Sequence, residues 1–346
     1  LLHPAQAGST YIKSDDNDLW IEGGKTWVDN GDSYRSILFK PNGLGELIVD
    51  GATAVEQTVV LPEGSTMRLN RSNALDQLSL NPEFSGNLAI DAEGLQITDD
   101  LMVNGTLTVN NLFTVTGSIE LPGYPGIITH DAGITGSHLV VNGDLTIREN
   151  TALDITGKGL AAGRTIDPMT GAEASSHAAD SHKGGSHGGI GGRNGPENYG
   201  SSTDPVTLGG GGVNGDYSGV TIAGGRGGGA MRVEAVTLTL SGQILADGQP
   251  GNYKSHNNYG GGGAGGSILI EVETFASGEF YDGFISASGG DGAGGEGAGA
   301  GGGGGGGRIA IYYTTKTFAG SIVVEGGDGI NSEASSEAGT LHEVEQ

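Results

Sequence analysis

Residues 261–272 read GGGAGGSILIEV, and this stretch decides the fold because a run of glycine leads directly into an alternating β strand. The same order recurs at 224–235 (GGRGGGAMRVEA) and at 302–313 (GGGGGGRIAIYY). Each copy is followed by a second apolar segment that ends in a glycine-rich turn, at 241–248 (SGQILADG), 283–292 (GFISASGGDG) and 320–329 (GSIVVEGGDG). One such unit cannot bury its apolar face alone, so the repeat predicts a β-solenoid in which stacked units share a core.

The alternation within the three first strands predicts which side chains face that core. The inward residues are expected to be Met231 and Val233, Ile268 and Ile270, and Ile309 and Ile311. Their neighbours Arg232, Leu269 and Ala310 are then expected to face outward. Arg232 fits an outward position well, whereas Leu269 does not.

A ladder of short strands precedes these repeats. The expected strands are rich in Val, Ile, Leu and Thr and end near Asn, Gly or Asp, which favour turns; they are 47–50, 66–70, 78–80, 88–91, 95–98, 101–109, 112–121, 138–147 and 153–156. No helical period persists, so we expect no helix. The expected fold is all-β, a right-handed parallel β-helix or closely related β-solenoid with long glycine-rich loops.

Four segments organise the chain. Residues 1–44 are expected to form an N-terminal β cap in which Trp20 and Trp27 close the apolar end of the stack, because terminal repeats need atypical caps. Residues 45–159 are expected to be solenoid rungs, 160–222 a Gly/Ser/His-rich loop insertion, and 223–346 the glycine-rich repeats. The chain opens at Leu1 rather than Met, and we expect it to be a piece of a larger protein.

The 70 glycines of the 346 residues need an explanation beyond turns. Ordering a glycine costs roughly 1 kcal/mol or more in backbone entropy, so seven in a row at 301–307 is expensive if ordered. Two accounts stay open at this point. The runs are flexible surface loops, or they pack as extended polyproline-II-like strands whose backbones approach closely.

Charge and composition restrict the partners. Lys and Arg total 16 against 41 Asp and Glu, a formal net charge of −25, which repels phosphate backbones and argues against nucleic acid. Neutral polysaccharides and divalent cations remain compatible. The sequence has no cysteine, so disulfides and thiolate metal sites are excluded, and no apolar run reaches the length of a transmembrane helix.

An ordered set of motifs over residues 138–346 carries a resemblance. These motifs are 145–159 (LTIRENTALDITGKG), 186–192 (SHGGIGG), 199–212 (YGSSTDPVTLGGGG), 227–233 (GGGAMRV), 261–270 (GGGAGGSILI), 302–313 (GGGGGGRIAIYY) and 338–344 (AGTLHEV). Together they resemble glycine-rich modules of large bacterial and protist secreted or cell-surface proteins. The resemblance implies an exterior location and a β-helix-like architecture, and it transfers no catalytic residues.

Two groups of residues are candidate metal ligands. His177, Asp180, His182 and His187 fall within eleven positions, and imidazole with carboxylate suits zinc, nickel or copper. Asp15, Asp16 and Asp18 offer hard oxygen ligands for a structural calcium ion. The alternative is that the histidine segment is a polar loop in which His187 bonds to a turn, since its spacing matches no standard metal motif.

Aromatic and amide side chains mark a candidate carbohydrate-binding surface. Flat rings meet the apolar faces of sugars and amides meet their hydroxyls; the residues are Asn252, Tyr253, His256, Asn257 and Tyr259, with Asn198 and Tyr199 as a shorter second group. Loops on one face of a repeat array often form its binding surface. The alternative is a variable loop without a ligand.

These observations favour an extracellular structural or adhesive surface protein that binds polysaccharide or associates with its own copies. A polysaccharide lyase or glycoside hydrolase on the same fold is the alternative, and Asp99 and Asp100 are its acid–base candidates. The sequence carries no G-x-S-x-G, H-E-x-x-H or P-loop motif to support an enzyme. An ice-binding array is disfavoured because the T-x-T pairs Thr106/Thr108 and Thr237/Thr239 are few and far apart.

Overall fold

The computed structural model describes a set of N-terminal strands and most of the chain from residue 101 onward. The N-terminal strands, of which the backbone alone is described, are 11–13, 18–21, 26–29, 33–39, 46–49, 54–60, 66–69, 87–90 and 95–97. From 101 to 346 the description has gaps at 104–105, 111, 125, 136, 176–181, 218–219, 256–257, 295–299 and 330–334. The described residues are all β or irregular, without a helix, so none of them forms a helix able to cross a membrane.

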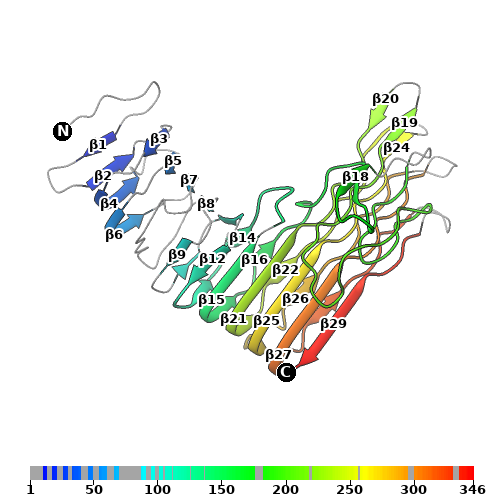
Figure 1. The fold of residues 1–346 in the computed structure, drawn as a ribbon. Helices are drawn as coiled ribbons and strands as arrows, with labels where there is room; N and C mark the ends of the chain where they lie inside the picture. Colours follow the sequence, from blue (N-terminus) through cyan, green and yellow to red (C-terminus); the bar gives the residue numbers. More distant parts are fainter. Residues whose placement is uncertain are drawn as a thin grey trace.

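Two long parallel sheets run side by side through the described part of the chain (Figure 1). The first contains β9 (Leu95–Ile97), β10 (Leu101–Met102), β12 (Leu112–Val115), β13 (Ile119–Leu121), β15 (His138–Ile147), β21 (Ala230–Leu240), β25 (Ser267–Ser277), β27 (Arg308–Thr317) and β29 (Thr340–Glu345). The second contains β3 (Thr26–Asp29), β5 (Glu46–Val49), β7 (Thr66–Leu69), β8 (Asn87–Ile90), β11 (Thr106–Val109), β14 (Ile127–Thr129), β16 (Ala152–Asp154), β22 (Gln243–Leu245), β26 (Phe284–Ser286) and β28 (Ser321–Val323).

Smaller pairings complete the strands. The first residues form a sheet of β1 (Tyr11–Lys13), β2 (Asp18–Ile21), β4 (Ser33–Phe39) and β6 (Ala54–Val60), in which β1 and β2 are antiparallel. Three antiparallel hairpins are β17–β18 (Arg164–Ile166, Glu173–Ser175), β19–β20 (Gly215–Tyr217, Val220–Ile222) and β23–β24 (Tyr253–Ser255, Asn258–Tyr259). Trp20 and Trp27 fall in β2 and β3, and their predicted capping contacts lie outside the described side chains.

Each C-terminal coil is one long strand of the first sheet followed by one short strand of the second. The register places Met231 beside Ile268 and Ile268 beside Ile309, so equivalent residues of successive coils stack. This gives an all-β protein with parallel sheets in a β-solenoid-like arrangement. The expected strand 138–147 is observed as β15, whereas 101–109 divides into β10 and β11, which belong to different sheets.

The predicted inward side chains form the core. Met231, Val233, Ile268, Ile270, Ile309 and Ile311 are all at most 2% exposed and belong to one continuous apolar cluster. Phe275 stacks on Phe318 with ring centroids 4.3 Å apart and helps to fill the corner of the last coils.

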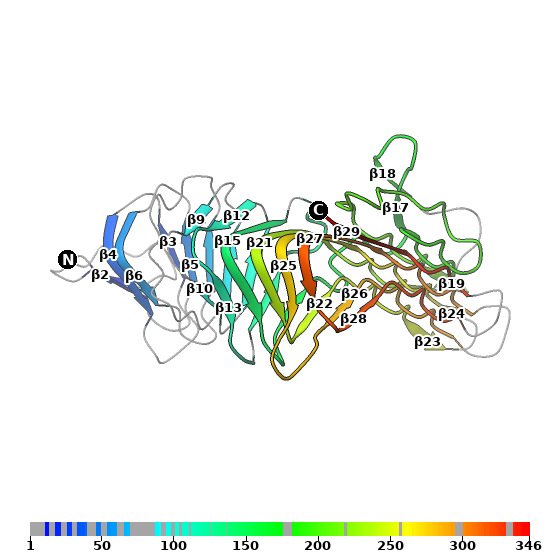
Figure 2. The ribbon, with the colours of Figure 1, turned by 90° about the horizontal axis from the view of Figure 1, so that it is seen from below.

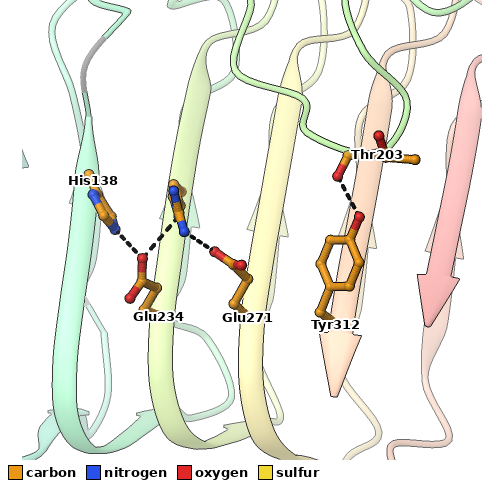
Figure 3. Close-up of polar contacts among 6 residues, drawn as sticks. His138, Thr203, Glu234, Glu271 and Tyr312 are labelled. Atoms are coloured by element: carbon orange, nitrogen blue, oxygen red, sulfur yellow. Dashed lines mark hydrogen bonds and ion pairs between the residues drawn. The ribbon is translucent and has the colours of Figure 1, made fainter. Parts of the chain in front are cut away.

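Leu269 and Ala310 face outward as predicted, since they are in register with Arg232 and do not belong to the apolar core, but both are buried by a segment that covers them. The segment 199–207 crosses the outer face of β25 and β27 and covers the start of these strands. Ser267 Oγ donates to the Thr207 carbonyl at 2.7 Å, and Tyr312 donates its hydroxyl to the Thr203 carbonyl at 2.6 Å (Figure 3). An apolar residue at position 269 is therefore suited to its covered position.

Where the segment 199–207 leaves the outer face open, this face carries charged side chains that join neighbouring coils (Figure 3). His138 Nε2 lies 2.9 Å from Glu234 Oε1, and Arg232 Nη2 lies 2.5 Å from Glu271 Oε2. These pairs are partly exposed, so each contributes at most about 1 kcal/mol to the free energy of folding. They mark the solvent side of the sheet and agree with the outward prediction for Arg232.

Candidate binding surface at the tips of the glycine rods

The glycine runs leave the solenoid and return to it as extended segments that we call glycine rods. In one coil, rod 246–251 follows β22 and rod 260–266 leads back into β25; in the next, rod 287–293 follows β26 and rod 300–307 leads back into β27. Figures 1 and 2 show the rods projecting to one side of the C-terminal coils, with the hairpins β19–β20 and β23–β24 at their far end. The ends of the rods and the described part of the loop between rods 246–251 and 260–266 therefore lie together at that end.

Rod 260–266 shows how the rods are held, because its backbone hydrogen bonds turn to a new neighbour at each residue. Gly261 donates to Val213, Gly262 to Gly302 and Gly263 to Gln249, at 2.9–3.0 Å. The next three donors repeat this order, to Gly210, Gly305 and Ala246. A period of three residues is that of a polyproline-II-type helix.

The carbonyls of the same rod accept from three further rods. Gly225 N donates to the Gly261 carbonyl, Gly185 N to the Gly262 carbonyl and Gly290 N to the Gly263 carbonyl, at 2.8–2.9 Å. Rod 260–266 is thus surrounded by six hydrogen-bonded neighbours: 183–192, 208–213, 223–229, 246–251, 287–293 and 300–307. This arrangement satisfies buried backbone groups without a β-sheet.

The close approach of the rods explains why they are made of glycine. A Cβ atom at Gly261 would lie 1.9 Å from the Lys183 carbonyl oxygen, one at Gly262 1.9 Å from that of Gly290, and one at Gly263 2.0 Å from that of Arg226. Three consecutive residues therefore meet three different rods, and each position excludes a side chain. The long glycine runs are packed rods, which decides between the two accounts that the sequence left open. Segment 160–222, expected to be an insertion, supplies two of these rods.

A buried polar group anchors rod 183–192 on the bundle. His187 Nδ1 donates to the Gly265 carbonyl at 2.9 Å, and the Thr207 hydroxyl donates to His187 Nε2 at 2.8 Å. These two hydrogen bonds require the neutral imidazole with its proton on Nδ1. Burial, together with the nearby charge of Arg308, lowers the pKa of His187 from 6.5 to about 4. Arg308 Nε donates to the Tyr199 carbonyl at 2.9 Å, and burial raises the pKa of Tyr199.

The candidate metal ligands are only partly within the described residues. His177, Asp180, Asp15 and Asp16 lie outside them, and of Asp18 only the backbone is described. The two described histidines bond to backbone carbonyls: His187 to that of Gly265 in rod 260–266, and His182 Nδ1 to that of Tyr259 in β24 at 2.5 Å. In the part of the chain that the structure describes, no three His, Asp or Glu side chains are grouped to hold a metal ion. Both metal sites stay predictions.

The candidate carbohydrate residues fall into an exposed group and a buried one. Tyr253 is 63% exposed at the rod tips and stacks on Tyr259, with ring centroids 5.4 Å apart and planes inclined by 16°. Asn252 is exposed beside it and donates to the Ala223 carbonyl at 3.1 Å. Tyr259 itself is 6% exposed and supports the ring of Tyr253. His256 and Asn257, on the same loop, lie outside the described residues.

The second pair, Asn198 and Tyr199, is placed differently. Tyr199 is 4% exposed; its ring lies 5.0 Å from that of His187, and its hydroxyl donates to the Leu208 carbonyl at 2.7 Å. Asn198 is exposed and donates to the Gly188 carbonyl at 3.4 Å. Tyr199 therefore packs the bundle, and the sugar-binding prediction rests on Tyr253 and its neighbours.

A pocket of about 630 Å³ lies between the β17–β18 hairpin and the segment 199–208. Two carboxylates line it. Asp167 accepts backbone hydrogen bonds from Met169 and Thr170, which lower its pKa, and Glu173 accepts from Arg164 Nε at 2.6 Å. A general acid needs a raised pKa, so Asp167 is not suited to that role.

Rows of threonine on the second half of the long strands were missed by sequence analysis. One row is Thr237, Thr274 and Thr315, and the other is Thr146, Thr239, Ala276 and Thr317. Spacing along the chain does not show which strands are neighbours, so the sequence identified Thr237 and Thr239 alone. The register sets equivalent residues about 4.8 Å apart from strand to strand, so this face is polar except where Ala276 interrupts the second row.

Comparisons with known proteins found no matching family model, no similar curated protein and no similar solved structure. The class of the protein is therefore defined by its own architecture, an all-β chain of parallel sheets in a solenoid-like stack that carries a bundle of glycine rods.

Proposed function

We propose that this chain is a rigid scaffold at the cell exterior, secreted or surface-attached, that holds binding loops at the tips of its glycine rods. In this proposal the solenoid is a right-handed parallel β-helix and belongs with the glycine-rich modules of large bacterial and protist surface proteins. The tip loops act adhesively, and their partner is a polysaccharide. Association between copies of the chain is the second partner considered.

The hydrogen-bonded rod bundle is the single observation that carries the proposal. Rod 260–266 is bonded on all six sides, and its glycines have no functional group of their own. Ordering so many glycines costs roughly 1 kcal/mol or more each in backbone conformational entropy. A rigid structural role explains why the chain nevertheless orders them. The rods themselves offer no side chains for binding, whereas the loops that they hold do, and among these Tyr253 is prominently exposed.

The net charge supports a neutral partner. A formal charge of −25 creates a field that repels uronic acid polymers and phosphate groups. Neutral sugars meet no such barrier, and they use aromatic faces and amides such as those of Tyr253 and Asn252.

A glycan array tests this function. The protein is expected to bind one or more neutral glycans, and Tyr253→Ala is expected to weaken that binding at least tenfold. Tyr124→Ala is the matched control, because Tyr124 is 84% exposed but lies at a solenoid corner far from the tips. A repeat with a chelator tests the predicted calcium ion, and sedimentation velocity at several concentrations tests self-association. A protein that binds no glycan and stays monomeric is a spacer, and the adhesive role is then refuted.

The enzyme alternative requires carboxylates gathered in a groove. Burial raises the pKa of Asp247, with Asp154 nearby, but its Oδ1 accepts from Ser286 Oγ and from Ser288 N, which ties it into the coil. Asp99 and Asp100 lie outside the described residues. A reducing-end assay on every glycan that binds decides the question, and cleavage of any of them would establish the enzyme.

A further inference from the structure

The corners at which long strands turn into short strands form a row along the solenoid, and one corner is longer than the turn requires. Between β21 and β22 the residues Ser241 and Gly242 suffice, and between β27 and β28 three residues, 318–320, make the turn. Between β25 and β26 the chain uses six, 278–283, which read GEFYDG. The extra residues are therefore not needed to close the coil.

This long corner is fixed in place at both ends. Ala319 N donates to Ser277 Oγ at 2.9 Å, and Ser277 Oγ donates to the Asp282 carbonyl at 3.3 Å. Gly283 has φ of 71°, and a Cβ there would lie 2.6 Å from the Leu240 carbonyl oxygen. In the middle of the loop, Tyr281 reaches across the short corner and donates its hydroxyl to Glu149. The loop is thus preorganised without burying its aromatic rings.

Two aromatic side chains of the corner are open to solvent, and a pocket lies on each side of one of them. Phe280 is 81% exposed and Tyr281 is 55% exposed. A pocket of about 350 Å³ and another of about 600 Å³ share Glu149, Ser241 and Tyr281 in their linings. Tyr281 therefore forms a ridge between two hollows on the same row of corners.

The two hollows add polar groups of different kinds. Thr146 and Thr239, from the rows of threonine, line the smaller pocket with Phe280. The amides of Asn150 and Gln243 line the larger one. Aromatic faces for the apolar side of a pyranose, with hydroxyls and amides beside them, are the groups that a sugar site needs.

We propose that this corner site, formed by Glu149, Phe280, Tyr281 and the two adjoining pockets, binds a neutral polysaccharide chain. Phe280 and Tyr281 stack on successive sugar rings, and Glu149 with the amides of Asn150 and Gln243 bonds their hydroxyls. The linings come from five neighbouring coils, which at about 4.8 Å per coil span roughly 19 Å along the axis. That length accommodates a few sugar units.

The charge of the site selects against acidic sugars. Glu149, Glu279 and Asp282 surround the aromatic rings, while the basic residue of the smaller pocket, Arg148, is paired with Glu120 at 2.6 Å. A uronic acid or sulfated sugar would meet uncompensated carboxylates. The site deepens the proposed function, on which it rests, by adding a second sugar-binding surface distant from the rod tips.

Titration calorimetry with cello-, xylo-, malto- and chitohexaose on the full chain tests the site. At least one of these is expected to bind, and the double variant Phe280→Ala/Tyr281→Ala is expected to lose at least tenfold in affinity. Both side chains are exposed, so the melting temperature of this variant should match that of the wild type. Tyr281→Phe keeps the ring and should retain more affinity than the double variant. Met169→Ala, at a residue that is 94% exposed and lines neither pocket, should bind as the wild type.

The outcomes separate this site from the rod tips. Loss of binding in the double variant, with or without a loss in Tyr253→Ala, supports the corner site. Loss in Tyr253→Ala alone overturns the corner site and leaves the proposed function standing. Wild-type protein that binds none of the hexasaccharides overturns both, and binding of oligogalacturonate as tightly as the neutral sugars overturns the assigned substrate class.

Discussion

Acid should loosen rod 183–192 from the bundle through a single histidine. His187 is fully buried as the neutral imidazole, with its pKa lowered from 6.5 to about 4. The unfolded chain binds a proton at this histidine at higher pH than the folded chain does. The stability that the buried neutral His187 contributes is therefore complete above pH 6.5 and is lost as pH falls toward 4. With these two pKa values the loss is about 2 kcal/mol at pH 5 and about 3 kcal/mol at pH 4.

Urea unfolding of the wild type and of His187→Gln at pH 7, 6, 5 and 4 measures this contribution. The carboxylates titrate in both proteins, so the difference between their free energies of unfolding isolates the histidine. The variant should be less stable at pH 7, because it leaves the Gly265 carbonyl or the Thr207 hydroxyl poorly bonded. The gap should narrow by about 2 kcal/mol at pH 5. A gap that is constant with pH would show that His187 titrates normally and is not enclosed by the rods.

Three further perturbations test the rods, the core and a buried carboxyl. Gly263→Ala places a methyl group 2.0 Å from the Arg226 carbonyl oxygen and should destabilise the protein by about 3 kcal/mol or more, whereas Gly123→Ala, which meets no atom within 4 Å, should change stability by less than about 0.5 kcal/mol in thermal unfolding. Phe275→Ala empties a fully buried position and should cost about 3–5 kcal/mol in urea unfolding, against no change for Met169→Ala at 94% exposure. Burial raises the pKa of Asp247 above 3.8, so its folded form holds its proton more tightly and its contribution to stability falls as pH rises above 3.8. Asp247→Asn keeps the acceptor for Ser286 and Ser288 and should be at least as stable as the wild type at pH 7, with a smaller decline in stability as pH rises above 3.8.

The apolar pattern of the repeats was sufficient to predict the core. Ile268 and Ile270 alternate strictly, and both are buried in the stack. Leu269 lies on the predicted outer face, but its burial was not foreseen. The segment that covers it, 199–207, is some 60 residues away, and local alternation carries no information about such a cover. The division of 101–109 into β10 and β11 was missed for a related reason, since both halves have β-forming sequences and differ only in the sheet they join.

The site residues were harder to predict than the core. Tyr199 and Tyr253 occur in similar Asn-Tyr sequences, yet one is buried and the other is 63% exposed. Burial here depends on how the rods pack, and a rod neighbour such as Gly302 is 40 residues from Gly262 along the chain. The corner aromatics Phe280 and Tyr281 did have a sequence signal, the extra length of GEFYDG compared with SG at the equivalent corner.

The close packing of the rods leaves little room for side chains. This restriction applies to the scaffold and not to the binding surface that it holds. The hydrogen bonds that join rod 260–266 to its six neighbours come from backbone groups, so the residues at the tips do not have to match those inside the bundle. A substitution at Tyr253 alters the exposed surface and leaves the contacts between rods unchanged. A methyl group at Gly263, in contrast, clashes with a neighbouring carbonyl oxygen. Diversity in binding should therefore be tolerated at the tips and corners and excluded from the rods. This division suits a scaffold whose partners differ while its framework stays the same.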